Sequence, residues 1–203
     1  MRVGAYGFVV PLYRTSALAA GLLVASLVIA GVVELRQSGR DRDDADSQDR
    51  GSRQLLGLSR LIGMIGAVVV VYAVPAADIH RARGLAFGIG LLVLWSGAAL
   101  RWWAFQTLGK YFTFSVMTEG DQPVITDGPY RLVRHPGYAG AILVRAGFGL
   151  ALGNWLSVAL AVLVPLIGVV YRIRVEETAL FDTLGDDYRS YAAGRKRLIP
   201  FVW

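Results

Sequence analysis

The order of apolar and polar residues divides the chain into five apolar runs separated by polar segments. An α-helix rises 1.5 Å per residue and the hydrocarbon core of a bilayer is about 30 Å thick, so ~20 apolar residues can cross it. The pattern therefore predicts an all-α integral membrane protein with about five transmembrane helices. The predicted spans are residues 16–33, 61–77, 84–100, 139–152 and 155–170.

The spans differ in length and in their spacing along the chain. The first is longer than the core of a signal peptide and is predicted to be retained. The second and third are rich in Gly and Ala, which favours close helix packing in lipid. Only Gly153 and Asn154 separate the last two, so these are expected to form an antiparallel hairpin. The fourth span is short, which leaves open whether it crosses fully or is tilted.

Two polar segments flank these runs and have different character. Residues 34–54 carry many Asp and Arg residues without apolar periodicity, which predicts a charged, solvated loop. The tail after Val170 is amphipathic, since Leu180 and Leu184 fall on one helix face. Gly185 is expected to end that helix, and a second short helix is expected to follow. The sequence therefore predicts amphipathic C-terminal helices.

Composition supports the membrane interpretation. Hydrophobic residues make up 55% of the 203 residues, charged residues only 18%, and the mean hydropathy is +0.48. The net charge is +6, but the basic residues flank apolar runs, which indicates membrane topology rather than nucleic-acid binding. The chain has no Cys and two His, which argues against a transition-metal site.

The distribution of Lys and Arg predicts the orientation. With five spans, sixteen of these residues flank the segments on the side of the tail and four lie on the other side. Basic residues concentrate on the cytoplasmic side of membrane proteins. We therefore expect a bacterial inner membrane protein whose active site faces the cytoplasm.

The first motif that carries chemistry, residues 122–138, is called here the His-Pro motif. Its Gly128-Pro-Tyr130 sequence predicts a short helical turn. The residue before a proline is pushed out of the helical region, so His135 should be extended and Pro136 should start the next helix. His135 would then lie at a helix N-terminus, where the helix dipole favours an anionic group. The alternative is a proline-stabilised loop in which His135 only caps the helix.

The second motif, residues 172–177, is called here the double-Glu motif. On a helix, Glu177 shares a face with Ile173 and Leu180, where an unpaired carboxylate is costly. Glu176 lies beside it and within reach of Arg172. Adjacent carboxylates near arginines indicate a cationic or zwitterionic ligand, although an ordinary ion-pair cluster is the alternative. We expect the two motifs to meet at the membrane surface and form one site.

Arg145 is a charged residue inside an apolar run. A charge within a span is a functional hypothesis by default. The alternative is that its long side chain extends to the membrane surface.

Together these motifs resemble a known family. The pattern Gly128-Pro-Tyr-Arg-x-x-Arg-His-Pro-x-Tyr-x-Gly140, followed by Arg172-x-x-x-Glu-Glu177, is similar to the isoprenylcysteine carboxyl methyltransferase family. Related phospholipid methyltransferases share part of it. The resemblance makes residues 97–203 the expected methyltransferase core and 1–96 an N-terminal membrane part. One departure is Leu184-Gly185, where the family has Phe-Gly.

The resemblance implies a membrane enzyme that uses S-adenosyl-L-methionine. Glutamates suit the sulfonium and ammonium groups of this cofactor, and His135 at a helix N-terminus suits its carboxylate. Glu176 and Glu177 are expected to close the cofactor pocket. The residues expected to line it are Val124, Thr126, Gly128, Tyr130, His135, Pro136 and Tyr138.

The resemblance also indicates the methyl acceptor, most directly the carboxylate of a prenylcysteine-like substrate. Such a group is ionised at neutral pH, and Arg172 or Arg174 is expected to hold its oxygens. An amine acceptor, as in a phospholipid N-methyltransferase, would need a base, for which Glu177 is the candidate. A non-enzymatic membrane scaffold is the remaining alternative. The expected partners are the lipid bilayer and a lipophilic or lipidated substrate; oligomeric state stays open.

Overall fold

The computed structural model describes residues 12–38, 49–109, 123–200 and 203, and their regular secondary structure is entirely helical. This confirms the predicted all-α fold class. In chain order the helices are α1 (Leu12–Thr15), α2 (Ala17–Ser38), α4 (Ser52–Ala73), η2 (Pro75–Ala77), α5 (Arg83–Leu108), η4 (Gly128–Arg131), α6 (Pro136–Ala151) and α7 (Trp155–Ala193).

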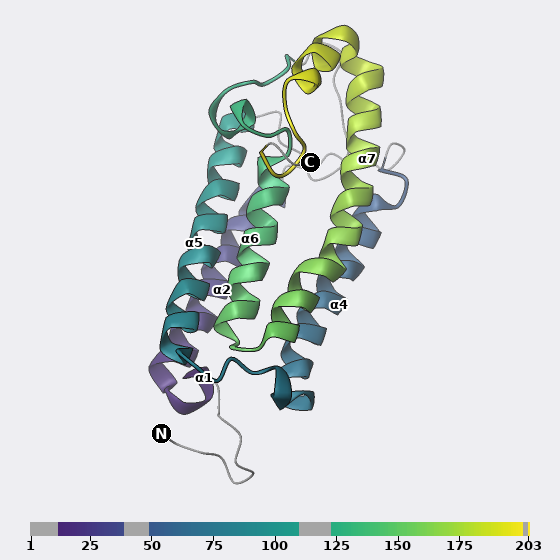
Figure 1. The fold of residues 1–203 in the computed structure, drawn as a ribbon. Coiled ribbons are helices and arrows are strands. Elements are labelled where there is room, and N and C mark those ends of the chain that lie inside the picture. The colour runs from purple at the N-terminus through teal and green to yellow at the C-terminus, as the bar shows by residue number, and fades with distance from the viewer. Residues whose placement is uncertain (1–11, 39–48, 110–122, 201–202) are drawn as a thin grey trace.

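The five long helices form an elongated bundle (Figure 1). Helix α5 packs along α6 and α4 packs along α7, while contacts between α6 and α7 join the two pairs. The end of the bundle where α6 begins, and beyond which α7 projects, is called here the polar end. The α6–α7 turn lies at the opposite end (Figure 1).

Three helices are long and apolar enough to cross a membrane: α4, α5 and α7, with 22, 26 and 39 residues. Exposed large apolar side chains such as Leu58, Leu85 and Leu163 lie on them, as expected for surfaces that contact lipid. The protein is therefore an integral membrane protein. Helix α6 has 16 residues, which span about 24 Å and fall short of a hydrocarbon core of about 30 Å. Full crossings by α2 and α6 stay predictions.

Glycines allow the α5 and α6 backbones to approach each other closely. A Cβ atom placed on Gly97 of α5 would lie 2.6 Å from the carbonyl oxygen of Gly140 on α6. One placed on Gly90 would lie 2.6 Å from the backbone nitrogen of Ala151. Small residues drive helix association in lipid because they maximise van der Waals contact between backbones. The Gly-rich third span predicted this packing.

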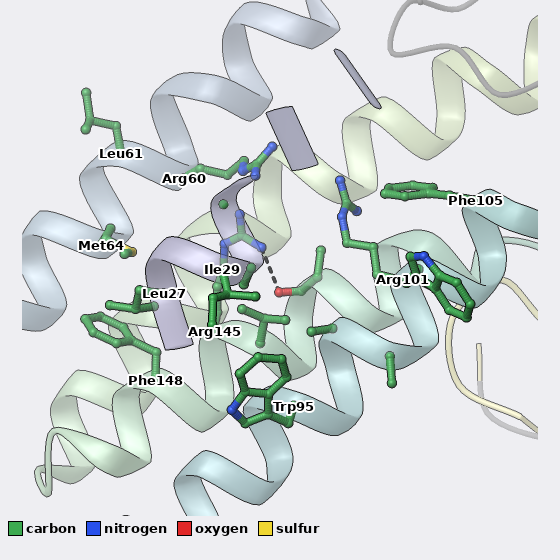
Figure 2. Close-up of a pocket in the computed structure, with 17 residues that line it drawn as sticks. Leu27, Ile29, Arg60, Leu61, Met64, Trp95, Arg101, Phe105, Arg145 and Phe148 are labelled. Carbon is green, nitrogen blue, oxygen red and sulfur yellow. Dashed lines mark hydrogen bonds between the residues drawn. The ribbon is translucent and has the colours of Figure 1, made fainter. Parts of the chain in front are cut away.

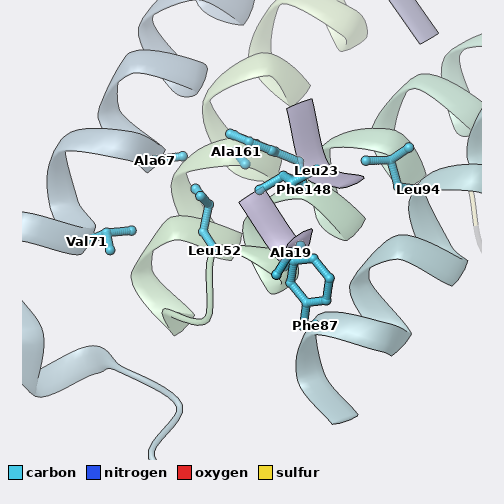
Figure 3. Close-up of a cluster of buried hydrophobic side chains, with 10 residues drawn as sticks. Ala19, Leu23, Ala67, Val71, Phe87, Leu94, Phe148, Leu152 and Ala161 are labelled. Atoms are coloured by element: carbon cyan, nitrogen blue, oxygen red, sulfur yellow. The ribbon is translucent and has the colours of Figure 1, made fainter. Parts of the chain in front are cut away.

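The centre of the bundle is a cluster of buried apolar side chains that joins α2 to the other long helices (Figure 3). Trp95 on α5 also donates a hydrogen bond from Nε1 to Oγ of Ser26 on α2, at 3.1 Å. These contacts hold the first span against the rest of the fold. The cluster comprises Ala19, Leu23, Ala67, Val71, Phe87, Leu94, Phe148, Ala151, Leu152 and Ala161.

Asn154 fixes the predicted α6–α7 hairpin at the end opposite the polar end. Its Oδ1 accepts the backbone N–H of Ser157 at 3.1 Å and thereby caps α7. Its Nδ2 donates to the Val74 carbonyl at 3.1 Å and to Oδ1 of Asp78 at 2.8 Å. The side chain is fully buried, so these bonds satisfy groups that would otherwise be costly to desolvate. The hairpin prediction is confirmed.

The charged loop expected at residues 34–54 is shorter than predicted. Helix α2 continues to Ser38 and α4 already begins at Ser52, while residues 39–48 lie outside the described part of the chain. Asp49 and Ser52 are buried rather than solvated. The physical reason is a buried arginine on α7 with which both residues form hydrogen bonds.

The tail has the predicted pair of helices. The element α7 extends from Trp155 to Ala193, but Gly185 inside it has non-helical φ and ψ of 53° and −127°, so that two helices meet there across a kink. Gly185 therefore ends the first helix and a second short helix follows, as predicted.

Candidate active site

The His-Pro motif has the predicted local structure. Residues 128–131 form the 3-10 helix η4, and Pro136 is the first residue of α6. His135, with φ of −125° and ψ of 59°, is the non-helical residue before it, as steric exclusion before proline requires. Its side chain is 5% exposed. The motif thus delivers a buried imidazole to the start of a membrane helix.

The end of the chain folds back against this motif. The backbone N–H of Arg134 donates to the Lys196 carbonyl at 2.8 Å, and that of His135 donates to the Arg197 carbonyl at 2.9 Å. These bonds satisfy amides that the proline turn leaves outside a helix. This backbone pairing with the His-Pro motif was not predicted from the sequence.

The two motifs meet at Glu177, as expected. Glu177 Oε1 lies 3.2 Å from Nε2 of His135 and 3.1 Å from Nη2 of Arg134, and its Oε2 accepts from Nε of Arg197 at 2.8 Å. The Glu177 side chain is 4% exposed, whereas that of Arg197 is 35% exposed. A buried carboxylate is tolerated here because each of its oxygens has a partner.

Electrostatics keep Glu177 ionised. Burial raises the pKa of its carboxyl group, but the hydrogen bond and charge of His135, the hydrogen bond from Arg197 and the charge of Arg134 lower it more. The resulting pKa lies below the usual value of 4.5. Glu177 is therefore ionised at neutral pH. It connects the two motifs through ion pairs and hydrogen bonds and does not act as a general acid or base.

Glu176 forms a second arm of the site. Its Oε2 accepts from the Tyr138 hydroxyl at 3.0 Å, and its Oε1 lies 3.9 Å from Nδ1 of His135. The Tyr138 hydroxyl accepts in turn from Nε of Arg172 at 3.3 Å. The Glu176 side chain is 32% exposed, far more than Glu177. It is the carboxylate of the pair that a ligand can reach.

Aromatic residues form one wall of the polar end. The Tyr191 hydroxyl donates to the Tyr130 carbonyl at 2.9 Å, which ties the last helical turns to η4. The Tyr188 ring packs edge-on against Phe181 at 5.0 Å between centroids. The kink at Gly185 makes this return possible, because its φ of 53° is accessible to glycine without strain. Burial raises the pKa of Tyr191 to about 12, so its hydroxyl stays protonated and can donate.

The structure places the other predicted site residues as follows. Pro136 and Tyr130 are buried beside His135, and Val124 is half-buried, whereas Thr126 is exposed. Gly128, with φ of 54°, lies where a Cβ atom would come within 2.6 Å of Thr107 Oγ1 on α5. Arg174 is exposed and no described contact brings it to the cluster. Their roles toward a cofactor stay predictions.

A cavity of about 560 Å³ lies between α2, α4, α5 and α6 (Figure 2). Its lining is mainly apolar and aromatic and includes Arg60, Arg101 and Arg145. Arg101 also donates from Nη1 to the Gly137 carbonyl at 2.8 Å, which joins the cavity to the first turn of α6. Arg145 donates to the Ala141 carbonyl at 2.7 Å.

Sequence reasoning missed several residues of this site. Arg134 belongs to the quoted family pattern but was given no role in the site, and Arg101 and Arg197 were not assigned to the site. The signal available for Arg134 was its position directly before His135. No local pattern could reveal Arg197 or Asp49, because each reaches the site through a long-range contact.

Comparison with known proteins shows which family part of the chain resembles. Residues 89–182 match the model of the Isoprenylcysteine carboxyl methyltransferase (ICMT) family. A relative described as a probable protein-S-isoprenylcysteine O-methyltransferase, from Oryza sativa subsp. indica, is 34% identical over 116 residues, covering 56% of this chain and 61% of the relative. The protein-S-isoprenylcysteine O-methyltransferase of Schizosaccharomyces pombe is also 34% identical over 116 residues, covering 56% and 48%.

A solved structure shows the same arrangement of helices. The eukaryotic intramembrane Ras methyltransferase ICMT superposes with a TM-score of 0.59 at 28% identity, over 72% of this chain and 52% of that chain. The chain spans about half to three fifths of the lengths of these proteins. Residues 89–182, which hold both motifs of the site, are therefore similar to the isoprenylcysteine carboxyl methyltransferase family.

Proposed function

We propose that the protein transfers a methyl group from S-adenosyl-L-methionine to the carboxylate of a lipophilic, prenylcysteine-like acceptor, at a site that faces the cytoplasm. The observation that carries the proposal is the buried contact between His135 and Glu177, at 3.2 Å, inside the region that matches the family. This contact joins two motifs that lie 42 positions apart in the chain. The names of the relatives support the proposed methyl-transfer reaction. The contact between His135 and Glu177 supports the proposed location of the site.

The residues at the polar end fit the methyl donor. S-adenosyl-L-methionine supplies a methyl group on a positively charged sulfonium. Glu176 offers a partly exposed carboxylate to its cationic groups, while the α6 N-terminus beside His135 favours its carboxylate. Glu177 contributes indirectly, because its oxygens are engaged by Arg134, His135 and Arg197. It fixes the shape of the site.

The cavity fits the acceptor. Apolar and aromatic side chains such as Trp95, Phe105 and Phe148 suit a prenyl-like chain, and the cavity volume of about 560 Å³ is in the range of small-molecule sites. We assign the acceptor carboxylate to Arg101, which lines the cavity and whose guanidinium donates to the Gly137 carbonyl in the first turn of α6. Arg172 fits this role less well, because Asp49, Ser52 and Tyr138 already hold it.

The chain's residues have an orienting role in this reaction. A carboxylate acceptor is already ionised at neutral pH, so no general base is required. Arg101 would orient the acceptor oxygen, and the apolar cavity would exclude water that competes for it. The reaction joins an anion to a cationic donor and leaves neutral groups, which a poorly solvated site at the membrane edge favours.

The test is a radiolabelled methyl-transfer assay with the purified protein in detergent, comparing N-acetyl-S-farnesylcysteine with phosphatidylethanolamine. We expect turnover of the acid, with activity that stays high from near neutral pH upward. Glu176→Gln should weaken donor binding in a thermal-shift titration, while Asp186→Asn, in an exposed ion pair, should not. Turnover of the amine alone would establish an N-methyltransferase instead. Absence of donor binding by the wild type would favour a scaffold.

A further inference from the structure

A buried ion pair connects the segment before α4 to the double-Glu motif. Asp49 and Arg172 form this pair, with side chains 8% and 3% exposed. We infer that Asp49 is a positioning residue for the donor site: it holds Arg172, and through Arg172 it fixes the Tyr138 hydroxyl against Glu176. The inference rests on the proposed function, because it assigns Tyr138 and Glu176 to donor binding.

The contacts form a continuous series from the N-terminal half of the chain to the site. Arg172 donates from Nη1 to Asp49 Oδ1 and to Ser52 Oγ, the latter at 2.7 Å. Its Nε donates to the Tyr138 hydroxyl at 3.3 Å, and that hydroxyl donates to Glu176 Oε2 at 3.0 Å. A planar guanidinium with donors in a fixed fork can hold both ends at once. The orientation of Tyr138 therefore depends on what holds the far side of Arg172.

The structure around Asp49 fixes its carboxylate in place. Oδ2 accepts the backbone N–H of Arg53 at 2.9 Å, and Oδ1 accepts from Ser52 Oγ at 3.2 Å. Arg50 and Gly51, with φ of 48° and 71°, form a left-handed turn between Asp49 and α4. The Arg50 carbonyl accepts from the Tyr171 hydroxyl at 3.1 Å, which ties the turn to α7. This geometry keeps the Asp49 carboxylate aimed at Arg172.

Asp49 and Ser52 precede residues 89–182, the region that matches the family. The N-terminal half of this chain thus supplies a counter-charge to Arg172 from outside the matched region. Without Asp49, the buried Arg172 would lose this carboxylate partner and be drawn toward Glu176, the carboxylate to which Tyr138 already links it. The Tyr138–Glu176 arm would then change its geometry.

The first test is a double-mutant cycle in donor affinity, with Asp49→Asn, Tyr138→Phe and the double variant. Calorimetric titration with S-adenosylhomocysteine in detergent gives the affinity. We expect Asp49→Asn to weaken binding by roughly tenfold, the low end for groups that orient a ligand through another side chain. In the Tyr138→Phe background the same change should cost at most about twofold, because coupled residues are not additive. Asp186→Asn, in an exposed ion pair, is the matched control.

Equal affinity of Asp49→Asn and wild type, or a fully additive double variant, would overturn the inference. Should Asp49→Asn fail to fold, Ser52→Ala keeps the ion pair and is expected to show a smaller loss in the same direction. An unchanged affinity of this second variant would then count against the inference.

A second readout separates this inference from the proposed function. The protein is labelled with 3-fluorotyrosine, and the Tyr138 signal is assigned by its loss in Tyr138→Phe. We expect Asp49→Asn, and not Asp186→Asn, to shift this fluorine resonance. A wild type that binds no donor would overturn the proposed function. In that case a shifted Tyr138 resonance in Asp49→Asn would still support the positioning role of Asp49, and an unshifted one would overturn it.

Discussion

Glu177 shows at the scale of one residue how a carboxylate can be kept inside a membrane protein. Its neighbours Arg134, His135 and Arg197 lie within 3.2 Å of its oxygens. Two of these partners come from the His-Pro motif and one from the end of the chain. Glu177 on α7 therefore connects the His-Pro motif and the end of the chain through its charge. Removal of that charge should lower the stability of the protein.

We expect Glu177→Gln to lower the free energy of unfolding by about 2 kcal/mol at neutral pH. Breaking a fully buried pair costs ~3–5 kcal/mol, and the 35% exposure of Arg197 reduces that figure. The measurement is thermal or chemical unfolding in detergent. Asp186→Asn serves as the control, because its ion pair with Arg189 is exposed and should contribute little.

We also predict how the difference in stability between the wild type and Glu177→Gln depends on pH. The Glu177 pKa in the folded protein lies below its usual 4.5, so the unfolded chain binds more protons just below that pH. The contribution is complete above pH 4.5 and is lost as pH falls through the folded-state pKa. The stability difference between wild type and Glu177→Gln should thus be constant above pH 4.5 and shrink below it. A difference that grows on acidification would contradict this assignment.

Local rules account for what the sequence revealed at this scale. The extended His135 followed from Pro136, and the apolar-face position of Glu177 followed from helical spacing, so their meeting could be predicted. Arg197 and Asp49 could not be found in this way. Each lies in a polar segment whose composition resembles a solvated loop, and only the tertiary fold brings it to its partner.

At the scale of helices, glycine positions decide which faces can meet. On α5, Gly97 lies against the α6 backbone, whereas among the described residues no atom outside the adjoining turns of α5 lies within 4 Å of a Cβ placed on Gly88. The two glycines occupy the same helix but have opposite surroundings. They therefore separate the effect of packing from that of helix propensity.

We expect Gly97→Ala to destabilise the protein by about 1–3 kcal/mol, since the added methyl group must displace the Gly140 carbonyl. Gly88→Ala should be neutral or stabilising by about 0.5–1 kcal/mol, because alanine loses less backbone freedom in a helix. Unfolding of both variants in the same detergent gives the comparison. Equal loss of stability in the two variants would mean that the α5–α6 packing is looser than described.

The existence and order of the long helices could be predicted from apolar runs, but their limits could not. Helix α4 begins at Ser52, inside the segment expected to be a loop, because the Asp49 carboxylate accepts the backbone N–H of Arg53 in the first turn and is itself paired with Arg172. Helical structure in α7 continues past its apolar run to the break at Gly185, and the short helix after the break packs against η4 through Tyr191. Helix ends depend on such tertiary partners, which hydropathy alone does not contain.

At the scale of the whole molecule, the site joins both halves of the chain at one end of the bundle. The His-Pro motif, the double-Glu motif and the returning C-terminus meet at the polar end (Figure 1). The segment at residues 78–82 lies at the opposite end, where Asp78 bonds Asn154. If the bundle crosses a bilayer, these two ends face different compartments.

This orientation can be tested because the chain has no cysteine, so each single substitution introduces one reactive thiol. His80 and Asp186 are both exposed, the first near the Asp78–Asn154 contact and the second just past the kink at Gly185. Sixteen Lys and Arg residues flank the predicted cytoplasmic side and four the other. We expect Asp186→Cys to react with a membrane-impermeant maleimide only after bacterial cells are permeabilised.

His80→Cys should react in intact cells, because α5, α6 and α7 lie between the two positions and place them at opposite ends of the bundle. The comparison does not depend on activity, so it tests topology apart from the proposed reaction. Labelling of both thiols from the same side would require an even number of crossings between them. That result would mean that one of the three helices between the two positions does not cross the membrane. The polar end and His80 would then lie on the same side of the membrane.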